Sequence, residues 1–228
     1  MRFLPSAVFL FLAALPAFCS PDAADILANA RLNPLGSEIS LDAQLRAGST
    51  KVPFTIEVKQ GRVAYIFESP REEILLRFGN DHARIERSKG GPPEPVPGEH
   101  MDDPVRGGLI TLEDLALDFL YWKNPKALGA ERVRSRDAWK LELRPPRGTS
   151  QYGAVRVWID KQSSALLRIE GYDKKGALSK RFEVVSAQKI DGQWMLRQMR
   201  VERIDPATRK TTGITYLEVT GARQPSQG

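Results

Sequence analysis

Few side chains of this 228-residue chain have the types and spacing that catalysis or metal binding requires. The chain has two histidines, His82 and His100, and one cysteine, Cys19. His82 follows the predicted turn 79–81, where a solvated histidine is the ordinary case. His100 lies in the acidic segment 99–103, which could hold a metal loosely but matches no standard ligand spacing. The sequence has neither a Gly-x-Ser-x-Gly elbow nor a glycine-rich phosphate loop, so we predict no catalytic residue, no metal site and no cofactor.

Two carboxylates one helical turn apart, Asp114 and Asp118, could form a paired-acid site. Thr111 and Asp114 also have the spacing of a capping box, in which the two residues bond reciprocally at the start of a helix. An acid at that end of a helix also interacts favourably with the helix dipole. We therefore expect Asp114 to cap a helix and Asp118 to be solvated or paired with an arginine.

The segment 111–125 predicts one helix that is apolar on nearly every side and ends at Pro125. Helical spacing places four apolar residues on one face of this helix: Leu112, Leu115, Phe119 and Trp122. Three more cover much of the remaining surface: Leu117, Leu120 and Tyr121. A helix of this kind must be buried on two sides. Near its end, Tyr121 and Trp122 could form either a ligand portal or a wedge in the core.

Residues 1–19 have the pattern of a secretory signal peptide. Arg2 precedes an apolar run that is broken by prolines and followed by small residues. Cleavage after Cys19 would leave a mature chain with no cysteine, which its core alone must hold together because no disulfide can form. The alternative is a lipid anchor on Cys19, although Phe18 before it fits that pattern poorly. We predict export to the periplasm of a Gram-negative-type bacterium.

The charge pattern argues against a nucleic-acid-binding protein. The formal net charge of +6 becomes +5 when Arg2 leaves with the signal peptide. Basic residues alternate with acids along the predicted strands, and no basic run has interleaved aromatic residues. About 200 residues suffice for one good core, so we predict a single domain over 22–220 and nothing that demands more than a monomer.

Alternating apolar and polar residues predict a long series of antiparallel strands on both sides of the central helix. We expect about ten or eleven strands, with a first helix at 23–32, a Pro- and Gly-rich loop without regular elements at 89–108, and a disordered tail at 221–228. Helices are too few for βαβ units, and an all-β sandwich would not need the central helix. The predicted fold class is mainly β (α+β): a strongly curved antiparallel sheet, or unclosed β-barrel, with the helices as a lid.

The central helix and the strands after it resemble the bacterial outer-membrane lipoprotein-sorting proteins, the LolA-like group, in its uncharacterised branch. The matching segments are EDLALDFLYWKNP (113–125), AWKLEL (138–143), VRVWIDKQSSALLRIEGYDKKG (155–176), KRFEV (180–184), DGQWMLRQM (191–199) and DPATRKTTGITYLEV (205–219). The resemblance implies a LolA/LolB-like fold, in which helices cover a hydrophobic cavity. It also implies work in the periplasm, between an inner-membrane exporter and an outer-membrane receptor.

We predict that the protein is a non-catalytic carrier of lipid acyl chains or acylated lipoproteins. The alternatives are an envelope sensor or protein-interaction module on the same fold and, less well supported, a hydrolase. The apolar residues that we predict to line the cavity are Phe54, Ile56, Tyr65, Phe67, Leu76, Leu115, Phe119, Trp122, Trp139, Leu141, Val157 and Trp194. Period-two placement assigns them to one face of each strand, but does not separate residues that touch ligand from residues that touch a helix.

Overall fold

The computed structural model describes residues 21–32, 38–79, 82–146, 148, 150–190 and 192–223. The predicted signal peptide at 1–19, with Cys19, lies outside the described residues. Of the predicted tail, residues 224–228 also lie outside them. Residues 221–223 were expected to be disordered, but they belong to the last strand, because Gly221 and Ala222 pair with Asp42 and Leu41 of the first strand.

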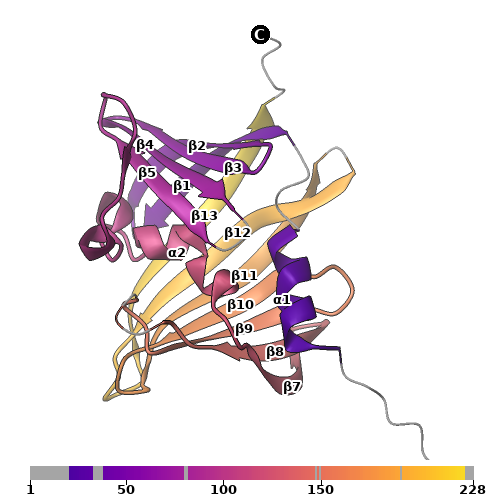
Figure 1. Cartoon of the computed structure of the whole chain (residues 1–228). Coiled ribbons are helices and arrows are strands. Elements are labelled where there is room, and N and C mark those ends of the chain that lie inside the picture. The colour runs from indigo at the N-terminus through magenta and orange to yellow at the C-terminus, as the bar shows by residue number, and fades with distance from the viewer. Residues whose placement is uncertain are drawn as a thin grey trace, which may run out of the picture.

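A single antiparallel sheet forms most of the described structure (Figure 1). Its thirteen described strands are β1 (Ile39–Ala47), β2 (Thr50–Lys59), β3 (Arg62–Glu68), β4 (Arg71–Phe78), β5 (Ala83–Ser88), β6 (Glu94–Pro95), β7 (Lys126–Val133), β8 (Arg136–Leu143), β9 (Ala154–Asp160), β10 (Leu166–Tyr172), β11 (Leu178–Ile190), β12 (Gln193–Ile204) and β13 (Thr211–Arg223). Their order is β6-β5-β4-β3-β2-β1-β13-β12-β11-β10-β9-β8-β7. In the described part of the chain the edge strands β6 and β7 do not pair, so the barrel is unclosed, as predicted.

Two short α-helices, α1 (Ala23–Leu32) and α2 (Leu112–Ala116), lie on the side toward which the sheet curves (Figure 1). Their apolar residues join one core with strand residues from both halves of the sheet. We call this covered side of the sheet the inner face, and the opposite side the outer face. No described helix has the length and apolar character needed to span a membrane.

The first helix has the bounds that the apolar spacing of the sequence predicts. It runs from Ala23 to Leu32, and Ala23, Ile26, Leu27 and Ala30 are the residues that it buries. The three-residue and four-residue spacings place these side chains on one face, so α1 packs against the core through a single stripe. Arg31 on its last turn lies with its guanidinium carbon 5.2 Å from the ring centre of Tyr121, which joins α1 to the segment after α2.

The prediction of one helix over 111–125 is wrong. The α-helix ends at Ala116, Leu117 has a left-handed backbone (φ 51°), and a 3₁₀ turn, η3 (Asp118–Tyr121), follows. A straight amphipathic helix would turn some of its apolar residues toward solvent. The break lets α2 bury Leu112 and Leu115 while η3 buries Phe119 and Leu120 at a different angle.

Two strands escaped the sequence pattern, and both lie at an edge of the sheet. β7 is exposed at every residue except Val133, so it has no alternation of apolar and polar side chains to detect. β6 has only two residues and lies within 89–108, where no regular element was expected. That segment also holds two 3₁₀ turns, η1 (Gly98–His100) and η2 (Val105–Gly107). Proline and glycine density excluded long elements there, but not short ones.

Candidate functional site

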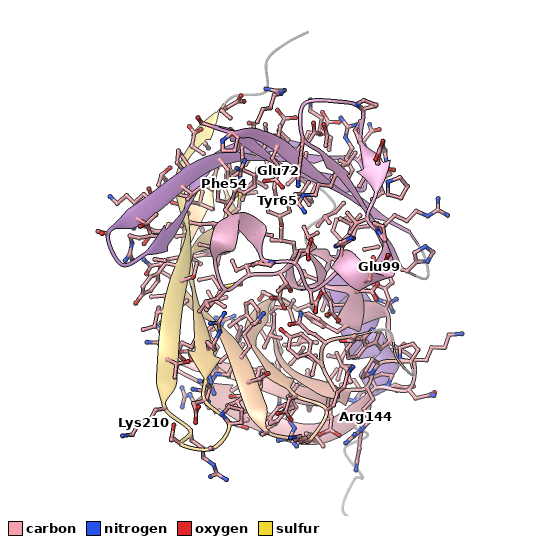
Figure 2. All side chains as sticks on the ribbon, turned by 90° about the vertical axis from the view of Figure 1, so that its left-hand side faces the viewer. Phe54, Tyr65, Glu72, Glu99, Arg144 and Lys210 are labelled. Carbon is pink, nitrogen blue, oxygen red and sulfur yellow. The ribbon has the colours of Figure 1, made fainter. Side chains whose placement is uncertain are left out.

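The inner face gathers most of the residues predicted to line a cavity. Nine of them are buried members of a single apolar cluster: Phe54, Ile56, Phe67, Leu76, Leu115, Phe119, Trp122, Leu141 and Val157. Tyr65 and Trp139 are partly buried and pack against the same cluster. Figure 2 shows Phe54 and Tyr65 beneath the strands that carry them, whereas Arg144 and Lys210 lie at the periphery. The structure thus brings these side chains together, and which of them contact a ligand stays a prediction.

Aromatic rings from β2 and β3 form one wall of the inner face. The rings of Phe54 and Phe67 stack with centroids 5.0 Å apart, and Tyr65 lies 6.1 Å from Phe54 in a tilted arrangement. Burial raises the pKa of Tyr65 to about 12, as expected for a phenol held in an apolar environment. On the lid side, Phe119 and Trp122 meet edge-to-face, with centroids 6.4 Å apart. Trp122, which is buried in the apolar cluster, is therefore a wedge in the core.

The structure does not bring Trp194 to this cluster. Its side chain is 70% exposed near the tip of the β11–β12 hairpin, with the Lys189 ammonium 5.4 Å from its ring centre. β13 pairs with β12 only from Gln198 onward, whereas β11 and β12 stay paired with each other as far as Gln193. Trp194 therefore lies on the part of the hairpin that β13 does not reach. Alternation in the sequence predicts which face of a strand a residue lies on, but it does not predict how much of that strand the helices and neighbouring strands bury.

A buried polar cluster fixes α2 to the sheet, and we call it the α2 latch: Thr111, Asp114, Tyr152 and Lys180. The Thr111 backbone N–H donates to Asp114 Oδ2 (2.9 Å), and the Asp114 N–H donates to Thr111 Oγ1 (3.3 Å), which confirms the predicted capping box. Lys180 Nζ from β11 lies 2.6 Å from Asp114 Oδ2. The Tyr152 hydroxyl donates to Asp114 Oδ1 (2.6 Å). One carboxylate therefore both caps the helix and joins it to the sheet.

The electrostatics of the α2 latch follow from its burial. The Asp114 side chain is 1% exposed and that of Lys180 is 10% exposed. Removing either charge alone would leave the other in a low-dielectric site without its partner, which is a costly state. Burial, followed by the charge of Asp114, raises the pKa of Tyr152 well above its usual value, so the phenol remains a hydrogen-bond donor.

A second acid extends the α2 latch toward the loop before β9. Glu113 accepts hydrogen bonds from the Ser150 hydroxyl and from the Gln151 backbone N–H (3.2 Å). Burial raises the pKa of Glu113, and the bonds from Ser150 and Gln151 oppose that rise. The Gln151 side-chain amide donates to Thr111 Oγ1 (2.9 Å). The whole start of α2 is therefore tied to the strand side of the core by polar contacts.

The sequence did not reveal Lys180 and Tyr152 as partners of Asp114, or Glu113 as a buried acid beside them. A signal was present for Lys180, because it has the same parity along β11 as Phe182, which is buried on the inner face. A lysine at an inward-facing strand position needs a buried acid. The partner could not be named from the sequence, since Asp114 lies 66 positions away.

A separate cluster holds the segment 89–108 against β4. Glu72 is 5% exposed and lies 2.5 Å from Arg87 and 2.9 Å from Arg106. Arg106 also places its guanidinium carbon 4.6 Å from the ring centre of Phe67, which belongs to the apolar cluster. His100 lies beside Asp103 (3.3 Å) at the exposed end of this cluster. Glu72, a buried acid between two arginines, was not foreseen.

Asp118 differs from the expectation of a solvated or arginine-paired residue, because it is half-buried and forms hydrogen bonds with the Ala83 backbone and the Trp122 side chain. Burial raises its pKa, and these bonds, together with His82 nearby, oppose the rise. His82 is exposed, and the Arg84 guanidinium reaches its Nε2 at 3.5 Å. Among the described residues, no group of three or more His, Cys, Asp or Glu could hold a metal ion.

Comparison with known proteins assigns the chain to a protein family. A family model described as an uncharacterized protein matches residues 91–224, more than half of the chain. The chain belongs to this family. No curated protein matches the sequence.

The solved structures that share this fold include the following three. The first is an outer membrane lipoprotein-sorting protein domain from Vibrio parahaemolyticus, with 18% sequence identity, coverage of 91% of this chain and 95% of that chain, and a TM-score of 0.73. The second is a DUF1329 family protein from Desulfovibrio piger, with 19% identity, coverage of 90% of this chain and 93% of that chain, and a TM-score of 0.68. The third is a LolA superfamily protein from Nitrosomonas europaea, with 15% identity, coverage of 92% of this chain and 96% of that chain, and a TM-score of 0.64. These likenesses confirm the LolA-like fold predicted from the sequence.

Proposed function

We propose that this LolA-like protein is a non-catalytic carrier, which binds lipid acyl chains or the acylated end of a lipoprotein against the inner face of its sheet. One observation carries the proposal. A curved sheet turns a continuous apolar face toward two short helices, and the second helix is held there by its buried apolar side chains together with a few polar contacts. The lipoprotein-sorting description of the Vibrio parahaemolyticus relative supports this proposal. We further propose that the protein is exported and works in the periplasm.

The energetics of such a carrier require a lid that opposes binding. Each buried CH₂ contributes about 0.8 kcal/mol, so a long acyl chain offers on the order of 12 kcal/mol before any cost is subtracted. A preformed open cavity would retain its cargo too tightly to deliver it. In the closed structure, the apolar residues of α2 and η3 occupy the inner face, and opening must break the α2 latch. The closed state thereby lowers the net affinity to a range that permits release.

The first experiment identifies what the native protein carries. Mature protein would be purified from its own periplasm without detergent, and organic extracts would be analysed by mass spectrometry. We expect an acyl lipid or an acylated peptide in near-stoichiometric amount. A protein that is empty, and that also fails to bind a fluorescent fatty acid, would overturn the carrier proposal.

A variant of the α2 latch tests the mechanism directly. Tyr152→Phe removes the hydroxyl that donates to Asp114 while keeping the ring. We expect about fivefold tighter binding of the fluorescent fatty acid, because the closed state loses one hydrogen bond to a charged group. Tyr172→Phe is the matched control, since that hydroxyl bonds Glu170 (2.7 Å) among residues that do not belong to the apolar cluster. Equal affinities of the two variants would contradict a latch that opposes binding.

A further inference from the structure

The sheet splits between β12 and β13 before either strand ends. β12 pairs with β13 only from Gln198, opposite Glu218, to Ile204. Beyond that point β12 stays with β11 as far as Gln193, while β13 stays with β1 as far as Arg223. Irregularities on both sides of Ser186 in β11 accompany the divergence. Within the described chain, residues 193–197 and 219–223 therefore have no strand partner on the sides that face each other.

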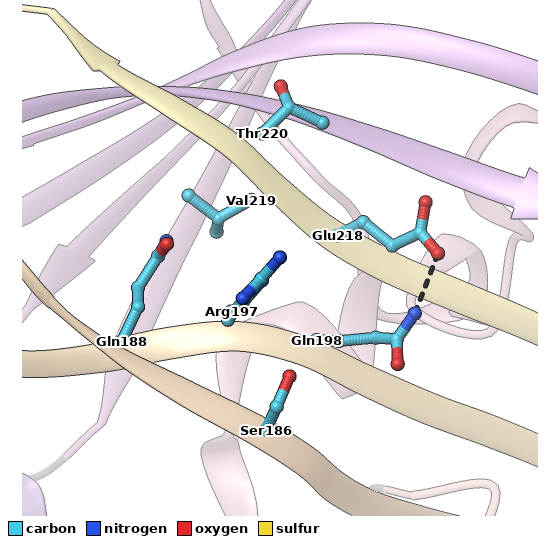
Figure 3. Close-up of a pocket in the computed structure, with 7 residues that line it drawn as sticks. All are labelled: Ser186, Gln188, Arg197, Gln198, Glu218, Val219 and Thr220. Carbon is cyan, nitrogen blue, oxygen red and sulfur yellow. Dashed lines mark hydrogen bonds between the residues drawn. The ribbon is translucent and has the colours of Figure 1, made fainter.

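A hollow of about 540 Å³ lies where the two strands part, and we call it the split hollow (Figure 3). Its volume is in the range of about 300 to 1,000 Å³ that is common for ligand sites. The residues that line it come from β11, β12 and β13: Ser186, Gln188, Arg197, Gln198, Glu218, Val219 and Thr220. Val219 belongs to the apolar core, whereas Glu218 points away from it. The hollow thus extends from the outer face to the margin of the inner face.

Some polar groups of the split hollow already have hydrogen-bond or ion-pair partners among the described residues, and others have none there. Glu218 is already engaged, by Arg46 (2.6 Å), Gln44 (2.6 Å) and Gln198 (2.8 Å). Gln188 Nε2, in contrast, is a buried donor without a hydrogen-bond partner. The exposed Arg197 forms no ion pair with any residue that the structure describes. The site therefore offers a buried N–H donor, a cation and two unpaired strand edges, while its acid is neutralised.

We propose that the split hollow receives an extended polypeptide strand with acidic side chains, namely the segment that follows the acylated N-terminus of a lipoprotein cargo. An added strand would pair its main chain with the free edge of β12, in the manner of β-augmentation. A carbonyl of that strand accepts from Gln188 Nε2, and an acidic side chain pairs with Arg197. The choice of cargo rests on the proposed carrier function, because acyl chains on the inner face require an exit for the polypeptide attached to them.

The test uses a synthetic diacylated peptide of alternating serine and glutamate, the same peptide without acyl chains, and palmitate alone. We expect Arg197→Glu and Gln188→Ala each to weaken binding of the diacylated peptide about tenfold, with palmitate affinity unchanged. Arg203→Glu is the matched control, because Arg203 is an exposed arginine of the same strand outside the hollow. Hydrogen exchange should show new protection at residues 193–197 with the diacylated peptide and none with palmitate.

The outcomes separate this proposal from the carrier function. If palmitate and the diacylated peptide bind equally well to wild type, Arg197→Glu and Gln188→Ala, and residues 193–197 gain no protection, the split hollow is not a peptide site although the carrier stands. If palmitate does not bind but the unacylated peptide protects residues 193–197, the carrier function falls and the peptide site stands.

Discussion

The inner and outer faces of the sheet are built from the same strands but have opposite chemistry. The inner face is apolar, and the α2 latch is a buried polar group within it. The outer face carries charged residues in register across neighbouring strands. One row runs over five strands, from β8 to β12: Glu142, Arg156, Glu170, Arg181 and Glu202. The charge alternates at every step of this row, so each pair of neighbouring residues in it joins opposite charges.

The contacts of the outer row are short but open to solvent on one side. Arg156 lies 3.0 Å from Glu142, and Arg181 lies 2.9 Å from Glu170. The two arginine side chains are 35% and 32% exposed, whereas their partners Glu142 and Glu170 are 11% and 9% exposed, so water reaches each pair from the arginine side. A charge pair in contact with water gains little, whereas the same pair in the interior is costly to break. We therefore expect the few polar groups of the inner face to contribute more to stability than the charge pairs of the outer face, which fix the strand register.

The largest expected effect comes from the aromatic wall of the inner face. Phe67→Ala removes a ring that is 1% exposed, stacks on Phe54 and lies under Arg106. We expect the free energy of unfolding in urea to fall by about 4 kcal/mol. Leu128→Ala, at an exposed position of β7, is the control and should change it by less than about 1 kcal/mol. Similar losses at the two positions would show that burial on the inner face does not determine the stability.

The α2 latch gives the next largest effect. Lys180→Ala leaves the Asp114 carboxylate buried without its cation, and we expect a loss of about 3 kcal/mol in unfolding free energy. Lys174→Ala, an exposed lysine in the turn after β10, serves as the control. An unfolding free energy within about 0.5 kcal/mol of wild type for Lys180→Ala would mean that the ion pair does not hold α2.

A smaller effect depends on pH and arises on the outer face. The hydrogen bond from Arg46 is the main cause that lowers the pKa of Glu218 from 4.5 to about 2, with burial acting in the opposite direction. Because the folded-state pKa is the lower one, the stabilisation is present above pH 4.5 and is lost as the pH falls toward about 2. Solvent screening limits it to about 1 kcal/mol.

Urea unfolding of wild type and Glu218→Gln across this pH range measures that contribution. We expect the two proteins to differ at pH 6 and to converge as the pH approaches about 2, the folded-state pKa. A difference that does not change with pH would show that Glu218 contributes through packing rather than charge.

The smallest effect belongs to an exposed pair. Arg71 and Glu68 lie 2.9 Å apart, but their side chains are 63% and 73% exposed. Arg71→Ala should change the unfolding free energy by no more than about 0.5 kcal/mol. A loss comparable with that of Lys180→Ala would show that outer-face pairs matter as much as the inner latch.

The sequence predicted the parts of this molecule that local patterns determine. Period-two alternation found the strands that have one covered face, and the Thr111–Asp114 spacing found the start of α2. It missed β7, because an edge strand exposed on both sides has no alternation. It also missed the break at Leu117, because the apolar pattern of residues 111–125 fits a continuous helix and the sheet beneath it decides where it bends.

Long-range pairing explains why the polar partners could not be predicted. Lys180 reaches Asp114 across 66 positions, and Tyr152 reaches it across 38. No local spacing relates such residues, because their contact depends on the register of the whole sheet. Trp194 shows the same limit in reverse: its strand was found, but its exposure depends on where β13 parts from β12.

Hydrogen exchange with and without palmitate tests whether α2 and η3 open over the apolar inner face. Peptides that cover residues 112–122 report on α2 and η3, and peptides from β9 report on the sheet beneath them. We predict that bound palmitate speeds exchange in 112–122 while β9 keeps its protection, because the acyl chain replaces the lid residues on the inner face. Palmitate that fails to bind, or that binds and leaves exchange in 112–122 unchanged, would contradict a carrier whose helices open over an apolar face.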